Sequence, residues 1–118
     1  MISQVSIGTG NHQKLESMLL TLKEEWSGVV AHPDMEMGCP FYVLNKQVER
    51  AILECGFPLS EHQADTKATL GNEQYALELF YCNPLIMVVI VYMFSETVFS
   101  DGETDTEMRL KDIRMVKL

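Results

Sequence analysis

The side chains that could carry out chemistry in this chain are few, and none of them forms a recognised motif. The sequence contains no Gly-x-Ser-x-Gly, no His-Glu-x-x-His and no Ser-x-x-Lys. This favours a protein that is not an enzyme. Catalytic groups converge in space rather than in sequence, however, so a small enzyme stays open. The side chains that we would test for a role in a pocket are Glu78, Tyr92, His32 and Cys39.

Glu78 is the candidate whose position matters most, because it lies in the most apolar region of the chain. We favour a position at a sheet edge, where its carboxylate faces solvent or an arginine of the last strand. The alternative is that Glu78 faces the core, where a buried carboxylate would need a partner. A carboxylate held in such a pocket is a candidate general acid or base.

Residues able to hold an ion do not occur at a recognised spacing. One group of four mixes hard oxygen ligands with a soft thiolate: His32, Asp34, Glu36 and Cys39. The acidic stretch that begins at Asp101 lacks the glycine that a calcium loop needs at its sixth position. Gly8-Thr9-Gly10 could bind an anion, but the third glycine of a dinucleotide fingerprint is missing. We therefore predict no metal and no cofactor.

The chain is acidic, and its charge is unevenly distributed. The formal net charge is −8, which disfavours nucleic acid as a ligand. Four basic residues against Asp112 give residues 109–118 a charge of +3, which leaves −11 for residues 1–108. Acidity can simply confer solubility, but it can also steer a protein towards a basic partner. The residues that we predict to bind such a partner are Asp101, Glu103, Asp105, Glu107, Met35 and Glu36.

The cysteines and the amino-terminal residues bear on the cellular compartment. Cys39, Cys55 and Cys82 are odd in number and have no Cys-x-x-Cys spacing, which favours reduced structural thiols in a cytoplasmic protein. Residues 1–10 lack the basic start and apolar core of a signal peptide. The longest apolar run is about half of the ~20 residues that a membrane-spanning helix needs, so we expect no membrane association.

That apolar run, Leu85–Phe94, predicts the central strand of a sheet. It carries no charge, is rich in valine and isoleucine, and follows Asn83-Pro84, all of which favour a strand over a helix. Side chains alternate along a strand, so both faces of this strand are apolar and both need a cover. Helices in a two-layer domain cover one face only. We expect a helix layer, a long loop or another protein chain over the second face.

Two amphipathic helices are predicted before this strand. The first follows a cap at Thr9 or Asn11 and ends near Gly28; its apolar residues are Leu15, Met18, Leu19, Leu22 and Trp26. The second covers residues 41–56, with Asn45 as a candidate cap; its apolar residues are Leu44, Val48, Ala51, Ile52 and Cys55.

The remaining segments predict strands. Ile2–Ile7 alternates as a short strand, and residues 29–31 form a short extended piece. Residues 59–82 favour a hairpin that turns at Gly71-Asn72, with a helix from Ser60 as the rival. Residues 108–118 favour a strand with a bulge at Asp112, with a helix capped at Thr104 as the rival. The predicted fold is one α+β domain over residues 1–118, with two amphipathic helices on an antiparallel sheet of about four to five strands.

Three functions are compatible with these features. The charge favours a small acidic protein-binding domain, of the inhibitor, immunity-protein or adaptor type, that docks on a basic protein. The alternative is a small enzyme or small-molecule-binding domain with a pocket between the helices and the sheet. The third is a homo-oligomer whose copies pack through the second sheet face, which the two-sided apolar strand fits equally well.

Overall fold

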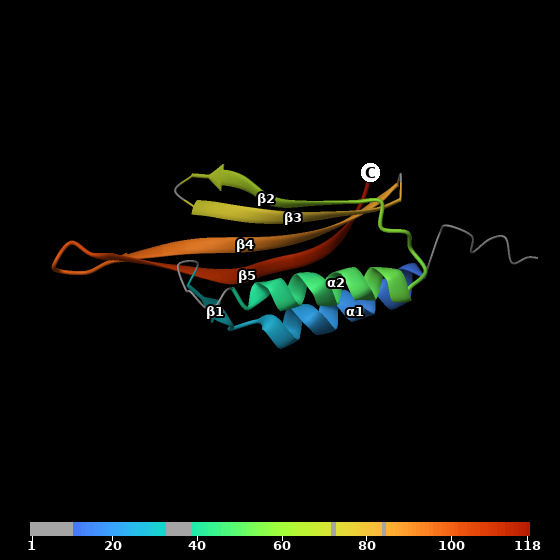
Figure 1. Cartoon of the computed structure of the whole chain (residues 1–118), viewed down its shortest axis with the longest axis horizontal. Coiled ribbons are helices and arrows are strands. Elements are labelled where there is room, and N and C mark those ends of the chain that lie inside the picture. Colours follow the sequence, from blue (N-terminus) through green and yellow to red (C-terminus); the bar gives the residue numbers. More distant parts are fainter. Residues whose placement is uncertain (1–10, 33–38, 72, 84) are drawn as a thin grey trace, which may run out of the picture.

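The computed structural model describes residues 11–32, 39–71, 73–83 and 85–118. Its elements follow in the order α1 (His12–Trp26), β1 (Val30–Ala31), α2 (Phe41–Glu54), β2 (Glu61–Leu70), β3 (Glu73–Asn83), β4 (Ile86–Val98) and β5 (Thr104–Lys117). Both helices lie on the same side of an antiparallel five-stranded sheet (Figure 1). This confirms the predicted α+β fold with two packed helices. The strand predicted at Ile2–Ile7 falls outside the described residues.

Strand β4 is the middle strand of the sheet, as its apolar sequence predicted. The strand order is β1-β5-β4-β3-β2, and β4 pairs antiparallel with β3 on one side and β5 on the other. The predicted pairing of residues 73–82 with residues 85–94 is confirmed. The strand continues past Phe94 to Val98, and there β4 and β5 form a long two-stranded hairpin.

A bulge in β5 allows its apolar residues to face the helices. Leu110 pairs with Tyr92 and Ile113 pairs with Ile90, although three positions separate the two β5 residues. Alternation alone would place them on opposite faces, so one extra residue, Lys111, has to be accommodated between them. The bulge predicted at Asp112 is confirmed, and the rival helix that Thr104 would have capped is wrong.

Both helices begin and end for local reasons. The Asn11 side chain accepts a hydrogen bond of 3.0 Å from the backbone amide of Lys14, which confirms the predicted cap of α1. Gly28 follows α1 with a φ of +86°, a value that L-residues rarely adopt. Helix α2 starts after Pro40 without a side-chain cap. The prediction that Asn45 caps this helix is therefore wrong, because Asn45 lies inside the helix.

Strands β2 and β3 form the predicted hairpin, with Gly71 in the turn at a φ of +63°. The rival helix from Ser60 is therefore wrong, and His62, expected in a loop or at a helix start, lies within β2. Thr, Lys and His side chains make β2 polar, as suits an edge strand with its outer hydrogen-bonding groups exposed.

The hydrophobic core lies between the helices and one face of the sheet. Helix α1 contributes Leu15 and Leu19, and the predicted apolar face of α2 is buried in full. The sheet contributes alternate residues of its two central strands: Ala76, Phe80 and Cys82 from β3, with Ile86, Val88, Ile90 and Tyr92 from β4. Among the described residues, no helix combines the length and apolarity needed to cross a membrane.

Candidate functional site

A chain of hydrogen bonds links helix α2 to the two central strands. The Tyr92 hydroxyl on β4 donates to Asn45 Oδ1 at 2.7 Å. Asn45 Nδ2 donates in turn to Glu78 Oε1 on β3 at 2.6 Å. Glu78 is 8% exposed, which makes it a buried acidic residue in the helix-facing side of the sheet. The three side chains form a polar network at one end of an otherwise apolar layer.

The protonation of Tyr92 fixes the direction of this network. Burial raises the pKa of the Tyr92 phenol, and the neighbouring Glu78 and Cys39 raise it further. The phenol therefore stays protonated and donates its hydrogen to an acceptor. Asn45 meets it with its amide oxygen, so the amide nitrogen of Asn45 points at Glu78. This arrangement holds the Glu78 carboxylate in place from the helix side.

His62 approaches the same carboxylate from the edge strand. Its Nε2 lies 3.4 Å from Glu78 Oε2. The His62 ring stacks on Phe80, with 4.1 Å between ring centroids and 12° between ring planes. His62 pairs with Phe80 in the β2–β3 register, which explains why the two rings meet. An acid and an imidazole are thus brought together by residues that are 16 positions apart in the sequence.

These groups line a cavity of about 650 Å³ between α2 and the sheet. Most of its wall is apolar or aromatic, whereas Lys46, Glu49 and Lys67 supply charged side chains. The size and the small set of convergent polar groups are typical of sites for small molecules. The apolar lining of the cavity includes Phe41, Phe94, Met108 and Cys39.

Three of the four pocket candidates named from the sequence meet in this cavity. Glu78, Tyr92 and Cys39 all line it, and the expectation that Glu78 lies at an exposed sheet edge is wrong. The reason is that Glu78 alternates with Leu77 and Leu79 and so faces the helix layer, where Asn45 of α2 bonds it. The fourth candidate, His32, lies elsewhere, beside Asp105.

His32 belongs to a small polar cluster that could hold a metal ion. Its Nδ1 lies 3.2 Å from Asp105 Oδ1, and Glu107 offers a third ligand atom within 4.8 Å. Glu107 also accepts a hydrogen bond from Arg109 at 2.9 Å. All three side chains are partly exposed. The His32–Asp105 and Glu107–Arg109 contacts also have a structural explanation, because they connect the segment after β1 to strand β5 and stabilise β5 itself.

The acidic residues predicted to bind a partner separate into two groups. Asp105 and Glu107 lie on β5 and bond His32 and Arg109. Asp101 and Glu103 lie in the exposed β4–β5 turn, where Asp101 accepts from the Glu103 amide at 2.9 Å. This hairpin end extends beyond the helices and the other strands (Figure 1). The other two predicted residues, Met35 and Glu36, fall outside the described residues.

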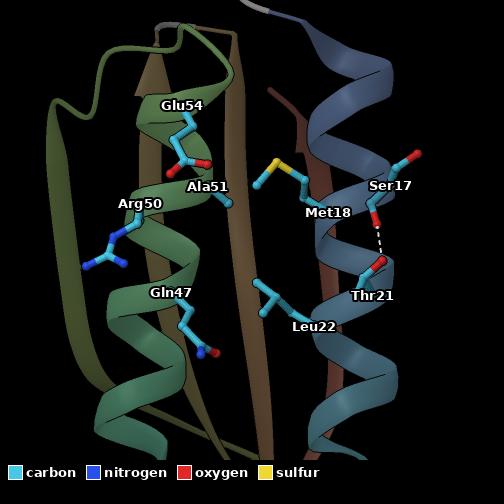
Figure 2. Close-up of a pocket in the computed structure, with 8 residues that line it drawn as sticks. All are labelled: Ser17, Met18, Thr21, Leu22, Gln47, Arg50, Ala51 and Glu54. Carbon is cyan, nitrogen blue, oxygen red and sulfur yellow. Dashed lines mark hydrogen bonds between the residues drawn. The ribbon is translucent and has the colours of Figure 1, made fainter.

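A second, smaller cavity of about 320 Å³ lies along the contact between the two helices. Met18 and Leu22 point from α1 towards α2, whereas the Arg50 side chain points away from the contact (Figure 2). Ser17 and Thr21 bond within α1, since the Thr21 hydroxyl donates to the Ser17 carbonyl at 3.0 Å. The cavity is therefore a surface groove between packed helices without convergent polar groups.

Comparison with known proteins gives no match, because no family model, curated protein or solved structure is similar to this chain. The function has to be argued from the geometry of the site. Sequence reasoning missed Asn45, taken for a helix cap, and His62, taken for a surface residue. Counting from the turn at Gly71 would place His62 opposite Tyr81, and only the register shift between Gln63 and Thr66 brings it opposite Phe80. No local pattern therefore marked His62.

Proposed function

We propose that this domain binds a small amphipathic molecule in the cavity between α2 and the sheet. The observation that carries this proposal is the buried Glu78 carboxylate, held by Asn45 and approached by His62 inside an aromatic pocket. A buried carboxylate is costly to keep in a core that does not use it. An evolved site offers a reason for keeping it.

The chemistry of the cavity suggests which class of molecule it takes. Carboxylate oxygens accept hydrogen bonds, so Glu78 suits a ligand head that donates, such as a protonated amine. The apolar wall suits an aromatic or aliphatic body. Lys46 and Lys67 line the same cavity and could meet an acidic group at the other end of the ligand.

Titration with three related compounds tests this proposal. We expect phenethylamine to shift the NMR signals of Asn45, Glu78 and Tyr92, and 2-phenylethanol and 3-phenylpropanoate to shift them less. Glu78→Gln keeps an acceptor for Asn45, so it should retain the fold and lose the preference for the amine. Glu54→Gln, an identical change on α2 outside this cavity, should keep it. Equal shifts with all three compounds in the wild-type chain and in Glu78→Gln would disprove a role of Glu78 in recognition.

The protruding β4–β5 hairpin favours a second function, docking on a basic protein. Val98 and Phe99 are 67% and 51% exposed there, next to the acidic side chains of Glu96, Asp101 and Glu103. Exposed apolar residues with acidic neighbours are typical of a contact surface for a basic partner. Free thiols at Cys39, Cys55 and Cys82 fit a cytoplasmic setting for either function.

Affinity capture from the source cells at two salt concentrations tests the docking function. A basic protein should bind the wild-type chain at low salt and leave at high salt. It should not bind a variant with Asp101→Asn and Glu103→Gln. Lysozyme, a basic protein without a matched surface, controls for unspecific charge attraction. A partner that ignores these two substitutions would rule out docking through the hairpin.

A further inference from the structure

The sheet face opposite the helices is apolar across its two central strands. Four cross-strand pairs form it, and each pair joins a residue of β3 to a residue of β4: Tyr75 with Met93, Leu77 with Val91, Leu79 with Val89, and Tyr81 with Met87. We call these eight residues the open face. Each alternates with a residue whose side chain faces the helices, such as Glu78 or Tyr92.

No described element covers the open face. Both helices lie on the other side of the sheet (Figure 1). The burial of the side chains agrees with this for most of the face. Phe80, Val88 and Ile90 on the helix side are inaccessible, whereas the open-face residues keep part of their surface exposed, except Val89 at 9%. The cover that the two-sided apolar sequence of β4 requires is therefore not supplied by the helix layer.

The open face is large enough for a stable contact between two chains. Four pairs along two strands that rise ~3.4 Å per residue and lie ~4.8 Å apart give an apolar area of about 260 Å² in projection. Side chains of β2 and β5 flank this area. Ala68 and Val116 are apolar, whereas Gln63, Arg109 and Arg114 would form a polar rim around the contact. With these flanks, two stacked sheets would bury about 600–800 Å² per copy, close to the size of a specific interface.

The charges around the open face point to an uncharged occupant. Arg109 bonds Glu107 at 2.9 Å, and Arg114 bonds Asp112 at 2.7 Å, so the charges on the β5 side neutralise one another. These paired charges do not form an acidic patch that would attract a strongly basic partner. A matching apolar face is the natural complement, and the flat face of a sheet packs well on another sheet about 10 Å away.

We propose that the open face packs against the same face of a second copy of this chain. Such a contact is self-complementary and closes as a two-fold dimer, with β4 of one copy over β4 of its partner. The helices and the cavity around Glu78 lie on the outer sides of this dimer. The proposal does not rest on the ligand-binding function, although Leu77 belongs to the open face and also lines the ligand cavity.

Mass measurement by light scattering over a range of protein concentrations tests the dimer. The wild-type chain should have twice its mass of 13.4 kDa. Val91→Lys places a charge in the centre of the open face and should yield monomers, whereas Val98→Lys, the same change in the exposed end of β4, should leave the dimer intact. Added salt should preserve or strengthen the dimer, because it screens the repulsion between two acidic chains.

A milder variant covers the case in which Val91→Lys fails to fold. Leu79→Thr with Met93→Thr keeps residues that suit strands, lies outside the ligand cavity and should weaken dimerisation by at least tenfold, with an unchanged circular dichroism spectrum. A wild-type monomer at millimolar concentration would overturn the proposal. If deletion of residues 1–10 then produced a dimer, the occupant would be the amino-terminal segment of the same chain, which overturns it equally.

Discussion

Asn45 Nδ2 donates a hydrogen bond of 2.6 Å to Glu78 Oε1 and so joins helix α2 to strand β3. The same amide accepts a hydrogen bond from Tyr92, so one side chain satisfies two buried polar groups. Alanine at position 45 would leave the Tyr92 hydroxyl and the Glu78 carboxylate without this shared partner. The consequences of that loss can be measured.

Asn45→Ala should lower the free energy of unfolding by about 1–3 kcal/mol, the usual cost of leaving buried polar groups unsatisfied. Urea unfolding followed by circular dichroism measures this change. Lys46→Ala, at the next and exposed position of α2, should change it by less than about 0.5 kcal/mol. Equal effects of the two substitutions would mean that the hydrogen bonds of Asn45 contribute nothing specific to stability.

The three thiols should differ in their reaction with a disulfide reagent such as DTNB. Burial raises the pKa of the Cys82 thiol to about 11 and also raises the pKa of Cys55, whereas Cys39 is only half-buried in the ligand cavity. At pH 8 we expect one thiol to react quickly and two to react only in urea. Cys39→Ser should remove the fast reaction. Bound phenethylamine should slow it, because the ligand occupies the same cavity.

Asp112 should contribute stability that depends on pH. Burial acts to raise the pKa of this carboxyl, but hydrogen bonds from Lys23 at 2.9 Å and Arg114 at 2.7 Å outweigh burial and lower it. A lowered pKa in the folded state gives stability that is fully present above the unfolded-state pKa of about 3.9 and is lost as the pH falls through the folded-state pKa.

Asp112→Asn should therefore be less stable than the wild-type chain at pH 7. The difference should shrink as the pH falls below about 4, where the Asp112 carboxyl is protonated first in the unfolded chain and at lower pH in the folded chain. Urea unfolding at pH 7, 5, 3 and 2 measures this difference. Asp101→Asn, in the exposed turn, provides the control. A difference that stays constant down to pH 2 would show that the charge of Asp112 is not the source of its effect.

Ile90→Ala should show how much the central strand β4 contributes to the free energy of unfolding. Ile90 points from β4 towards the helices and is fully buried, so its truncation should cost about 2–5 kcal/mol through lost burial and a residual cavity. Leu20→Ala, on the exposed side of α1 at 56% exposure, should cost far less. Thermal and urea unfolding measure the stability of both variants. Similar losses of stability would contradict a core that lies between the helices and this face of the sheet.

Residue patterns alone predicted much of the architecture. The spacing of Leu15 and Leu19 defined the buried face of α1, and the uncharged run around Val88 placed β4 at the centre of the sheet. The glycine at position 71 marked the hairpin turn, and the one-residue shift near Asp112 marked the bulge. These features succeed because alternation, helical period and positive φ are local properties of the chain.

The sequence by itself thus determined the α+β fold, the buried faces of the elements and the need for a cover over both faces of β4. Only the tertiary structure decided that Glu78 is buried, because its burial depends on α2 covering this face of β3. It also decided which side chains surround Glu78, since Asn45 and His62 come from different elements. Contacts between distant segments depend on strand order and helix placement, which local patterns do not encode.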